Sequence, residues 1–237
     1  MPGTELLFRD DAYVRESAAT VMVAEGGRVQ LDRTIFYPQG GGQPGDRGSF
    51  ITEDGRVFRV TDTRKGVGAD GVIHLVEGDA AGLVAGTMLT AMIDWDYRYR
   101  LMRLHTCLHL LCAVVPGAVT GGQISDGKAR LDFDVDAASL DKDEITATLN
   151  RLIEAGHAVT PRWISDEEMA DRPELVRTMS VKPPTGFGRV RLLDIAGVDL
   201  QPCGGTHVKN TAEIGKVLVT KIENKGRQNR RVNISFP

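Results

Sequence analysis

Two short segments that lie far apart in the chain each carry a pair of potential metal ligands with the same four-residue spacing. The first pair is His105 and His109, in a stretch without glycine or proline, and residues four apart on a helix lie on one face. The second pair is Cys203 and His207, where two intervening glycines allow a turn tight enough to aim both side chains at one point. Three imidazoles and one thiolate suit tetrahedral zinc. The pattern therefore predicts a fold that brings both segments to one zinc ion per chain.

Neither pair alone identifies a metal site. A histidine pair on a helix is often a coincidence of surface or core positions, and a buried cysteine beside a loop histidine is also ordinary. A zinc peptidase of the H-E-x-x-H type needs a glutamate directly after the first histidine, and that position is Thr106, so this class is excluded. We expect the other cysteines, Cys107 and Cys112, to be core residues.

The composition restricts the class of protein. The chain has 237 residues, 41% hydrophobic and 26% charged, which favours two modest globular domains. A formal net charge of -3 gives no overall cationic field, so a nucleic-acid partner would bind to local basic patches. Three cysteines indicate a reducing compartment rather than a disulfide framework. The start lacks a basic flank and an apolar core, and the longest apolar run, Leu110 to Val115, is far shorter than the ~18 residues of a membrane span. We therefore expect a cytoplasmic protein without a membrane partner.

Short β-favouring runs separated by glycine-containing turns dominate residues 1–91. The runs lie at 13–24, 28–37, 48–51, 57–62 and 71–75, and turn signals such as Glu25-Gly26-Gly27 separate them. No segment in this region predicts a helix. We expect a small antiparallel β-barrel or sandwich as the first domain.

The pattern changes near Asp94, and residues 96–115 predict the first long helix, which ends at Pro116-Gly117. Apolar residues at helical spacing form its predicted core stripe: Leu101, Leu104, Leu108, Leu111 and Val115. The remaining chain predicts strands at 128–135, 159–164, 190–195, 214–223 and 231–236, a helix at 140–156, and a short helix opened by the capping box Ser165-x-x-Glu168. We therefore expect residues 92–237 to form an α+β domain in which helices pack on an antiparallel sheet.

A glycine-rich segment, Gln-Gly-Gly-Gly-Gln-Pro-Gly-Asp, runs from Gln39 to Asp46. It formally matches the dinucleotide fingerprint G-x-G-x-x-G, but that fingerprint opens a helix, and here the residues after Pro44 lead into a predicted strand. We therefore expect no nucleotide cofactor. Two interpretations remain, a plain tight turn or a closely packed wall of a binding pocket.

The glycine-rich segment, the H-x-x-x-H helix and the C-G-G-T-H loop, in this order, resemble the editing region of alanyl-tRNA synthetase. The chain more closely resembles the free-standing alanyl-tRNA editing proteins of AlaX type that keep the small β-domain, almost from end to end. The second domain of threonyl-tRNA synthetase shares the histidine and cysteine pattern, but the glycine-rich segment favours the alanine branch. No residues are left over for an aminoacylation domain, so activation of alanine with ATP is not expected.

This resemblance implies a zinc-dependent aminoacyl-tRNA deacylase that hydrolyses tRNA(Ala) mischarged with serine, and glycine is a further candidate. His105, His109, Cys203 and His207 match the family's zinc ligands. Thr120 falls where the family places the side chain that recognises the serine hydroxyl, an assignment that can shift to Gln123 or Ser125. The family's glycine-rich motif lies beside the editing pocket, which implies wall positions for Gln39, Gly40, Gly41, Gly42, Gln43 and Asp46.

The expected reaction needs little beyond water and charge stabilisation, because an aminoacyl-tRNA ester is already activated. Bound zinc lowers the pKa of water to about 7 and polarises a carbonyl oxygen. Four protein ligands close a zinc site, however, whereas catalysis by zinc-bound water needs an open position. Either His207 is a loose or outer ligand, or zinc mainly positions the substrate and another group activates water. A site built to hydrogen-bond the serine hydroxyl would reject alanine.

Two local basic clusters are candidates for contact with tRNA phosphates. One is on the histidine helix and contains Arg98, Arg100 and Arg103. The other is on the last predicted hairpin and contains Lys221, Lys225, Arg227, Arg230 and Arg231. Charge clusters are also common on solvated faces without a ligand, so a tRNA affinity that is insensitive to salt would exclude both.

Two other functions fit the same residues. One is a zinc hydrolase of small esters or amides that does not use RNA. The other is a non-catalytic, zinc-stabilised RNA-binding module, which metal removal would unfold. A two-domain protein with incidental histidines is the remaining alternative, and metal analysis of the purified protein tests it.

Overall fold

A computed structural model describes residues 3–68, 71–135, 140–176, 188–227 and 229–237. The chain divides into two compact units, Met1–Tyr99 and Arg100–Pro237. A closed antiparallel barrel, further antiparallel sheets and α-helices make up the described structure, so the predicted α+β class is confirmed. None of the helices in the described ranges is both long and apolar enough to cross a membrane.

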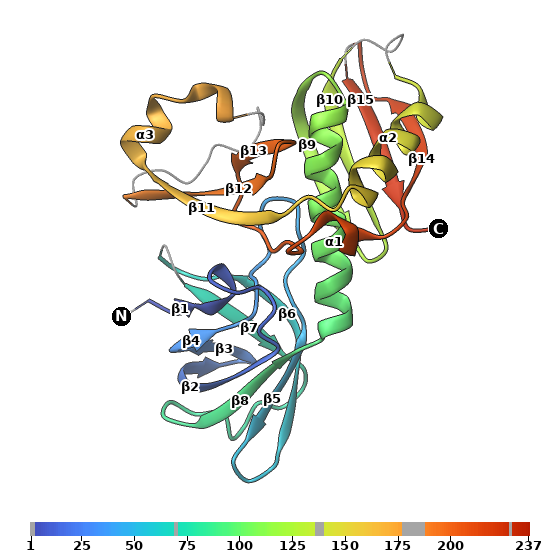
Figure 1. The fold of residues 1–237 in the computed structure, drawn as a ribbon. Coiled ribbons are helices and arrows are strands. Elements are labelled where there is room, and N and C mark those ends of the chain that lie inside the picture. Colours follow the sequence, from blue (N-terminus) through green and yellow to red (C-terminus); the bar gives the residue numbers. More distant parts are fainter. Residues whose placement is uncertain (1–2, 69–70, 136–139, 177–187, 228) are drawn as a thin grey trace. The chain divides into compact units, whose positions relative to one another are not determined.

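The first unit is built around a six-stranded closed barrel with the strand order β2-β3-β7-β6-β5-β8 (Figure 1). Its strands are β2 (Glu16–Glu25), β3 (Arg28–Leu31), β5 (Gly48–Thr52), β6 (Val57–Lys65), β7 (Val72–Val76) and β8 (Met88–Ile93). A parallel pair, β1 (Glu5–Leu6) and β4 (Arg33–Thr34), and the short 3-10 helix η1 (Leu7–Arg9) complete it. The sequence predicted either a barrel or a sandwich, and the closed order of hydrogen-bonded strands shows that the structure is a barrel.

The barrel interior contains alternate residues of each strand, as a closed sheet requires. Phe36 and Phe50 are fully buried there and contact each other edge to face at 5.8 Å. Strand β8 was not predicted. Its buried Leu89, Ala91 and Ile93 alternate with more exposed positions, but two of these are methionines, which do not mark the exposed face of a strand.

The described residues of the second unit form two antiparallel sheets and three α-helices. The larger sheet has the order β14-β15-β10-β9 and the smaller has the order β11-β12-β13. Its strands are β9 (Ala118–Ser125), β10 (Lys128–Asp134), β11 (Val159–Ser165), β12 (Arg189–Ile195), β13 (Asp199–Pro202), β14 (Leu218–Asn224) and β15 (Asn229–Ser235). The helices are α1 (Trp95–Val114), α2 (Lys142–Glu154) and α3 (Asp166–Ala170), with the 3-10 turns η3 (Pro173–Leu175) and η4 (Thr211–Ile214).

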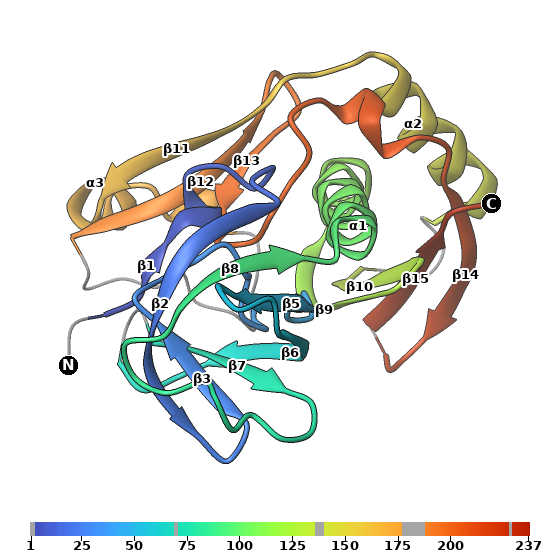
Figure 2. The same ribbon diagram turned by 90° about the horizontal axis from the view of Figure 1, so that it is seen from below.

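Helix α1 begins beside Asp94, whose side chain accepts a hydrogen bond from the backbone N–H of Tyr97. The predicted leucine stripe is buried, but so are Met102 and Leu110 on other sides of the helix. Figure 2 shows α1 nearly end-on, with β10, β15 and α2 around its later turns. A helix enclosed in this way is apolar around most of its circumference, so a single stripe underestimated its burial.

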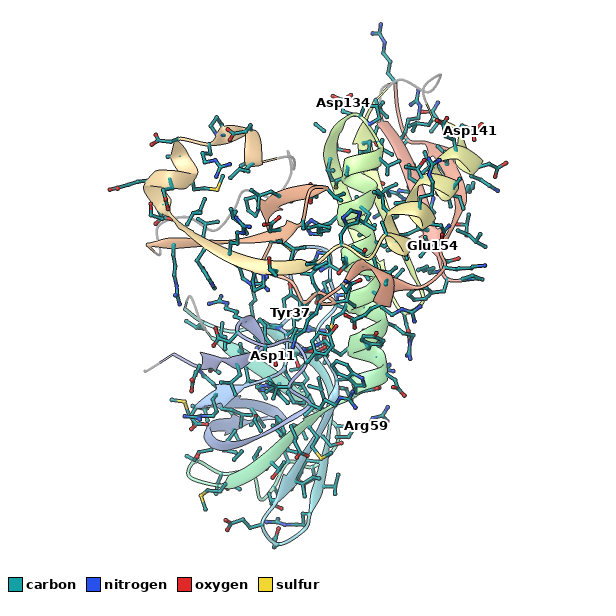
Figure 3. The ribbon with its side chains drawn as sticks, viewed as in Figure 1. Asp11, Tyr37, Arg59, Asp134, Asp141 and Glu154 are labelled. Carbon is teal, nitrogen blue, oxygen red and sulfur yellow. The ribbon has the colours of Figure 1, made fainter. Side chains whose placement is uncertain are left out.

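Polar side chains cap the N-termini of α2 and α3. Asp141 accepts hydrogen bonds from the backbone N–H groups of Asp143 and Glu144 at the start of α2, and Glu154 ends the helix (Figure 3). Ser165 and Glu168 form the predicted capping box of α3. The predicted strand at 214–223 begins later, at Leu218, because η4 and a glycine with positive φ, Gly215, precede it. Strands β9 and β13 were not predicted.

Candidate metal centre

Four side chains from α1 and from the loop after β13 converge in the second unit. One potential ligand atom from each of His105, His109, Cys203 and His207 lies within 4.8 Å of the others. The three imidazoles are buried and Cys203 is partly buried. The structure therefore brings together the two pairs that the sequence analysis singled out, in a cluster that could hold a metal ion.

The spacing of the donor atoms tests whether this cluster fits zinc. Cys203 Sγ lies 3.1 Å from His207 Nε2 and 3.6 Å from His105 Nε2. Tetrahedral coordination with Zn–N bonds of about 2.0 Å and Zn–S bonds of about 2.3 Å separates neighbouring ligand atoms by roughly 3.5 Å. The donor types and these two separations therefore fit a zinc ion.

A buried carboxylate holds one of the imidazoles. His109 Nδ1 lies 3.0 Å from Asp199 Oδ2, and Gln201 Nε2 donates to the same oxygen at 2.7 Å. The hydrogen bond keeps the His109 proton on Nδ1 and leaves Nε2 facing the cluster, as is usual for metal-binding histidines. The second carboxylate oxygen of Asp199 is buried and has no hydrogen-bond partner among the described residues.

A threonine orients a second imidazole in the same way. The hydroxyl of Thr106 donates to the backbone carbonyl of Met102 at 3.0 Å, so its oxygen must accept from His207 Nδ1, 3.2 Å away. It also accepts from the backbone N–H of Val208. His207 therefore carries its proton on Nδ1 and presents Nε2 to Cys203.

Strand geometry explains how the loop reaches the cluster. Successive side chains of a strand alternate between faces, so Asp199, Gln201 and Cys203 point the same way. The ladder continues one residue past β13, because the backbone N–H of Cys203 donates to the carbonyl of Arg191. The Arg191 guanidinium then donates to the carbonyls of Cys203 and Gly205. These bonds fix the loop on which the Cys203 and His207 side chains depend.

The electrostatics favour the protonation states that a metal needs. Burial opposes ionisation of Cys203, but the charges of His105 and His207 and hydrogen bonds from the imidazoles hold its pKa well below 9.0. Burial lowers the pKa of His207 well below 6.5. For His109 burial also acts downward, but Asp199 and Cys203 outweigh it and raise its pKa to about 9. A thiolate that takes its counter-charge from an imidazolium is ready to exchange that proton for a metal cation.

Asp199, Gln201 and Thr106 were not predicted as supporting residues. A signal was present for the first two, because they precede Cys203 at intervals of two, the period of a strand face. Thr106 was considered only as evidence against a zinc peptidase, because it stands where that class has a glutamate. Its contact with His207 depends on a long-range approach that no local pattern encodes.

The residues predicted to recognise the substrate lie on β9. Strand β9 is irregular here, because Asp132 pairs with Gly121 while Phe133 pairs with Val119, which leaves Thr120 as the extra residue of a bulge. The Thr120 hydroxyl donates to the backbone carbonyl of Asp132 at 3.2 Å. Gln123 is exposed and accepts from Arg130. Bulges often redirect a side chain beside a functional site.

The glycine-rich segment belongs to the first unit and forms a tight turn. Gly40 and Gln43 exchange two backbone hydrogen bonds, and Gly41 and Gly42 between them both have positive φ, at 56° and 82°. Such a two-residue turn requires glycine-like conformations at both central positions. Strand β5 follows, without a helix, in agreement with the rejection of a nucleotide loop. Whether the segment also forms a pocket wall stays a prediction.

The end of this segment is tied down by a buried ion pair. Asp46 and Arg98 are both fully buried and hydrogen-bonded to each other. The guanidinium also donates to the carbonyls of Ala12 and Ile35, and Asp46 accepts from the backbone N–H of Tyr37, which Figure 3 labels. Arg98 is therefore a structural residue of the first unit, and we remove it from the predicted tRNA contacts.

The other basic candidates differ in exposure. Arg230 is buried and donates to Asn224 and Gly226 within its own hairpin, so it too is removed. Arg100 pairs with Asp126, and Arg231 forms two hydrogen bonds with Asp132. Several candidates remain at the surface of the second unit, wholly or in part: Arg100, Arg103, Lys221, Lys225, Arg227 and Arg231. Their contact with tRNA stays a prediction.

Comparison with known proteins places this fold and site among relatives of tRNA synthetases. The family of the threonyl and alanyl tRNA synthetase second additional domain matches residues 190–233, which include the C-G-G-T-H loop. The class II (A) tRNA synthetase family matches residues 6–97. The class is therefore that of synthetase-related proteins with the second additional domain.

Individual relatives define the family more closely. Alanyl-tRNA editing protein AlaX-M of Methanosarcina acetivorans is 40% identical over 97% of this chain and 97% of its own length. The AlaX-M protein of Saccharolobus solfataricus is 36% identical with the same coverage. An alanine–tRNA ligase of Metallosphaera sedula is 34% identical over 94% of this chain but only 25% of the ligase. The chain belongs to the AlaX-M family of alanyl-tRNA editing proteins, as its sequence resemblance indicated.

Proposed function

We propose that this protein is a trans-editing hydrolase, which deacylates tRNA(Ala) carrying the wrong amino acid. The observation that carries the proposal is the convergence of His105, His109, Cys203 and His207 in a chain related over nearly its whole length to AlaX-M proteins. Serine is the proposed principal amino acid, and glycine is a second candidate.

We assign the cluster to zinc, with one ion per chain. Zinc held by these residues would polarise the ester carbonyl and make a water molecule more acidic. The protein's own residues hold the donor atoms in the orientation that a metal ion requires. Asp199 orients His109 and Thr106 orients His207, so both imidazoles direct Nε2 inward without further rearrangement.

Four protein ligands would close the coordination sphere, so one of them must yield if substrate or water is to bind there. We propose His207 as the ligand that yields, because it lies four residues beyond the point at which the backbone of Cys203 is bonded to the neighbouring strand. His105 and His109 lie on the enclosed helix α1, whose backbone is held by its own hydrogen bonds.

Selection against the correct amino acid is assigned to Thr120. Its hydroxyl hydrogen is engaged by the carbonyl of Asp132, so its oxygen is the atom that can accept a hydrogen bond from the hydroxyl of a seryl group. An alanyl group lacks that donor, and a polar site left without its partner rejects such an analogue strongly. The bulge in β9 gives this residue its distinct position.

The test is incubation of the purified protein with tRNA(Ala) charged separately with serine, glycine and alanine, with and without a chelator. We expect rapid loss of serine, slower loss of glycine, little loss of alanine, and inactivation when zinc is removed. Turnover of small esters without turnover of charged tRNA would favour the small-ester hydrolase. Binding of tRNA without any turnover would favour the RNA-binding module.

A further inference from the structure

The three-stranded sheet of the second unit has two unlike faces. One face packs under α3 and η3 through an apolar cluster that includes Val190, Leu192 and Met169. The opposite face carries the other alternate residues of each strand. On β13 these are Asp199 and Gln201, which support the metal cluster.

An exposed aromatic residue shares this second face with the metal ligand. Trp163 on β11 pairs in register with Arg191 on β12, and Arg191 in turn pairs with Cys203 through a backbone hydrogen bond. Trp163, Arg191 and Cys203 therefore form one row across three adjacent strands. With about 4.8 Å between neighbouring strands, the backbone of Trp163 lies roughly 10 Å from that of Cys203.

Trp163 is well exposed for a large aromatic residue, because its relative exposed area is 38%. The guanidinium of Arg189 lies over the ring, 4.4 Å from its centroid. The charged residues on this face of β11 and β12 are Arg189 and Arg191, both positive. An exposed aromatic plane among cations is the combination with which proteins bind single-stranded nucleic acid, by stacking bases and neutralising phosphates.

We propose that Trp163, with the Arg189 guanidinium over its ring, is the stacking platform for the terminal base of the tRNA 3′ end, and that Arg189 also contacts the adjoining phosphate. This inference rests on the proposed function, since the ester to be cleaved is attached to the ribose of that same terminal nucleotide. The length of the row from Trp163 to Cys203 is about that of one nucleoside. The base on Trp163 thus sets the distance at which the ester meets the metal cluster.

Fluorescence gives a test that does not depend on catalysis. The chain has two tryptophans, so Trp95→Phe leaves Trp163 as the only one. Trp95 lies in the first unit, where it stacks on Tyr99, and phenylalanine retains an aromatic ring there. Titration with uncharged tRNA(Ala) should quench Trp163, and the same tRNA without its terminal adenosine should quench it far less. Equal quenching by both RNAs, or by neither, would overturn the proposal.

Kinetics give the second test. Trp163→Ala should raise KM for seryl-tRNA(Ala) about ten-fold or more, the usual consequence of losing one stacked base, whereas Trp163→Phe should retain most of the affinity. Arg189→Ala should raise KM, and its matched control, Arg162→Ala, should not. Arg162 is an exposed arginine on the opposite face of the sheet, where it pairs with Asp194.

The outcomes separate this inference from the proposed function. Unchanged KM in Trp163→Ala, with normal zinc content and fold, would exclude stacking and leave the deacylase intact. If the wild-type protein deacylates no charged tRNA, the proposed function fails, and the fluorescence comparison still decides whether Trp163 binds an RNA end. A Trp163→Ala protein that loses zinc would show a structural role and count against the proposal.

Discussion

His109 and Asp199 join α1 to β13 through a buried contact of 3.0 Å between imidazole Nδ1 and carboxylate Oδ2. Gln201 donates to the same oxygen, so the carboxylate is held from a second side. The contact couples the helix that carries one ligand pair to the strand that leads to the other pair.

Asp199→Asn tests this contact. The amide can still accept from His109, but the negative charge that supports the imidazole is lost. We expect zinc affinity to fall about 10- to 100-fold, as for other outer partners of metal ligands. Competition with a coloured chelator measures the affinity. Asp194→Asn, which alters the carboxylate that pairs with Arg162 on the other face of the sheet, should leave it unchanged. Wild-type affinity in Asp199→Asn would show that the carboxylate does not support the ligand.

Thr106→Val should destabilise the metal-free protein. The substitution leaves the Nδ1–H of His207 and the N–H of Val208 without their acceptor, and each unsatisfied buried donor costs about 1–3 kcal/mol. Urea denaturation in the presence of a chelator measures the loss. Thr106→Ser keeps the hydroxyl and should restore most of the stability. If serine and valine behave alike, the hydrogen bonds to Thr106 are unimportant.

Thr120→Val should reduce the preference for seryl- over alanyl-tRNA(Ala). Loss of one hydrogen bond to the substrate hydroxyl corresponds to about a ten-fold fall in the ratio of kcat/KM values. Thr220→Val removes an exposed hydroxyl that also donates to a backbone carbonyl, on β14 in the same sheet, and should leave the ratio unchanged. A wild-type ratio in Thr120→Val would assign recognition to another residue, and Gln123 and Ser125 would be tested next.

His74 should make the stability of the first unit depend on pH. It is fully buried between Thr34 and the carbonyl of Val29, and burial lowers its pKa from 6.5 to about 4. The unfolded chain therefore takes up the proton first, so stability is complete above pH 6.5 and falls as pH drops toward 4. Between pH 7.5 and 5 the loss should be about 2 kcal/mol. Urea denaturation at both pH values should show this loss in wild type and in the control His157→Gln, but less of it in His74→Gln.

Asp46→Ala should strongly destabilise the first unit. Removal of one partner leaves the Arg98 charge buried without its counter-charge, which costs about 3–5 kcal/mol. The matched control is Glu77→Gln, because Glu77 forms an exposed pair with Arg59, labelled in Figure 3, and such surface pairs contribute about 0–1 kcal/mol. Thermal denaturation compares the two variants. Similar small shifts would show that the buried pair contributes little.

The amino-acid sequence determined most of the local structure and the identity of the metal cluster. Alternation predicted most barrel strands, the helix before Pro116 and the capping box at Ser165 followed from local rules, and the spacing of His105, His109, Cys203 and His207 pointed to one ion. These features depend on residues within a turn or two of each other, or on the limited chemistry of metal ligands. These features can therefore be predicted from local patterns in the sequence.

Tertiary structure alone decided what surrounds those residues. Arg98 is a surface candidate when only its helix is considered, yet its charge is buried against Asp46 from a distant turn. Thr106 and Asp199 acquire their roles only when α1 meets β13 and the loop after it. Burial and long-range hydrogen bonds depend on which segments pack together, and that information is distributed over the whole chain.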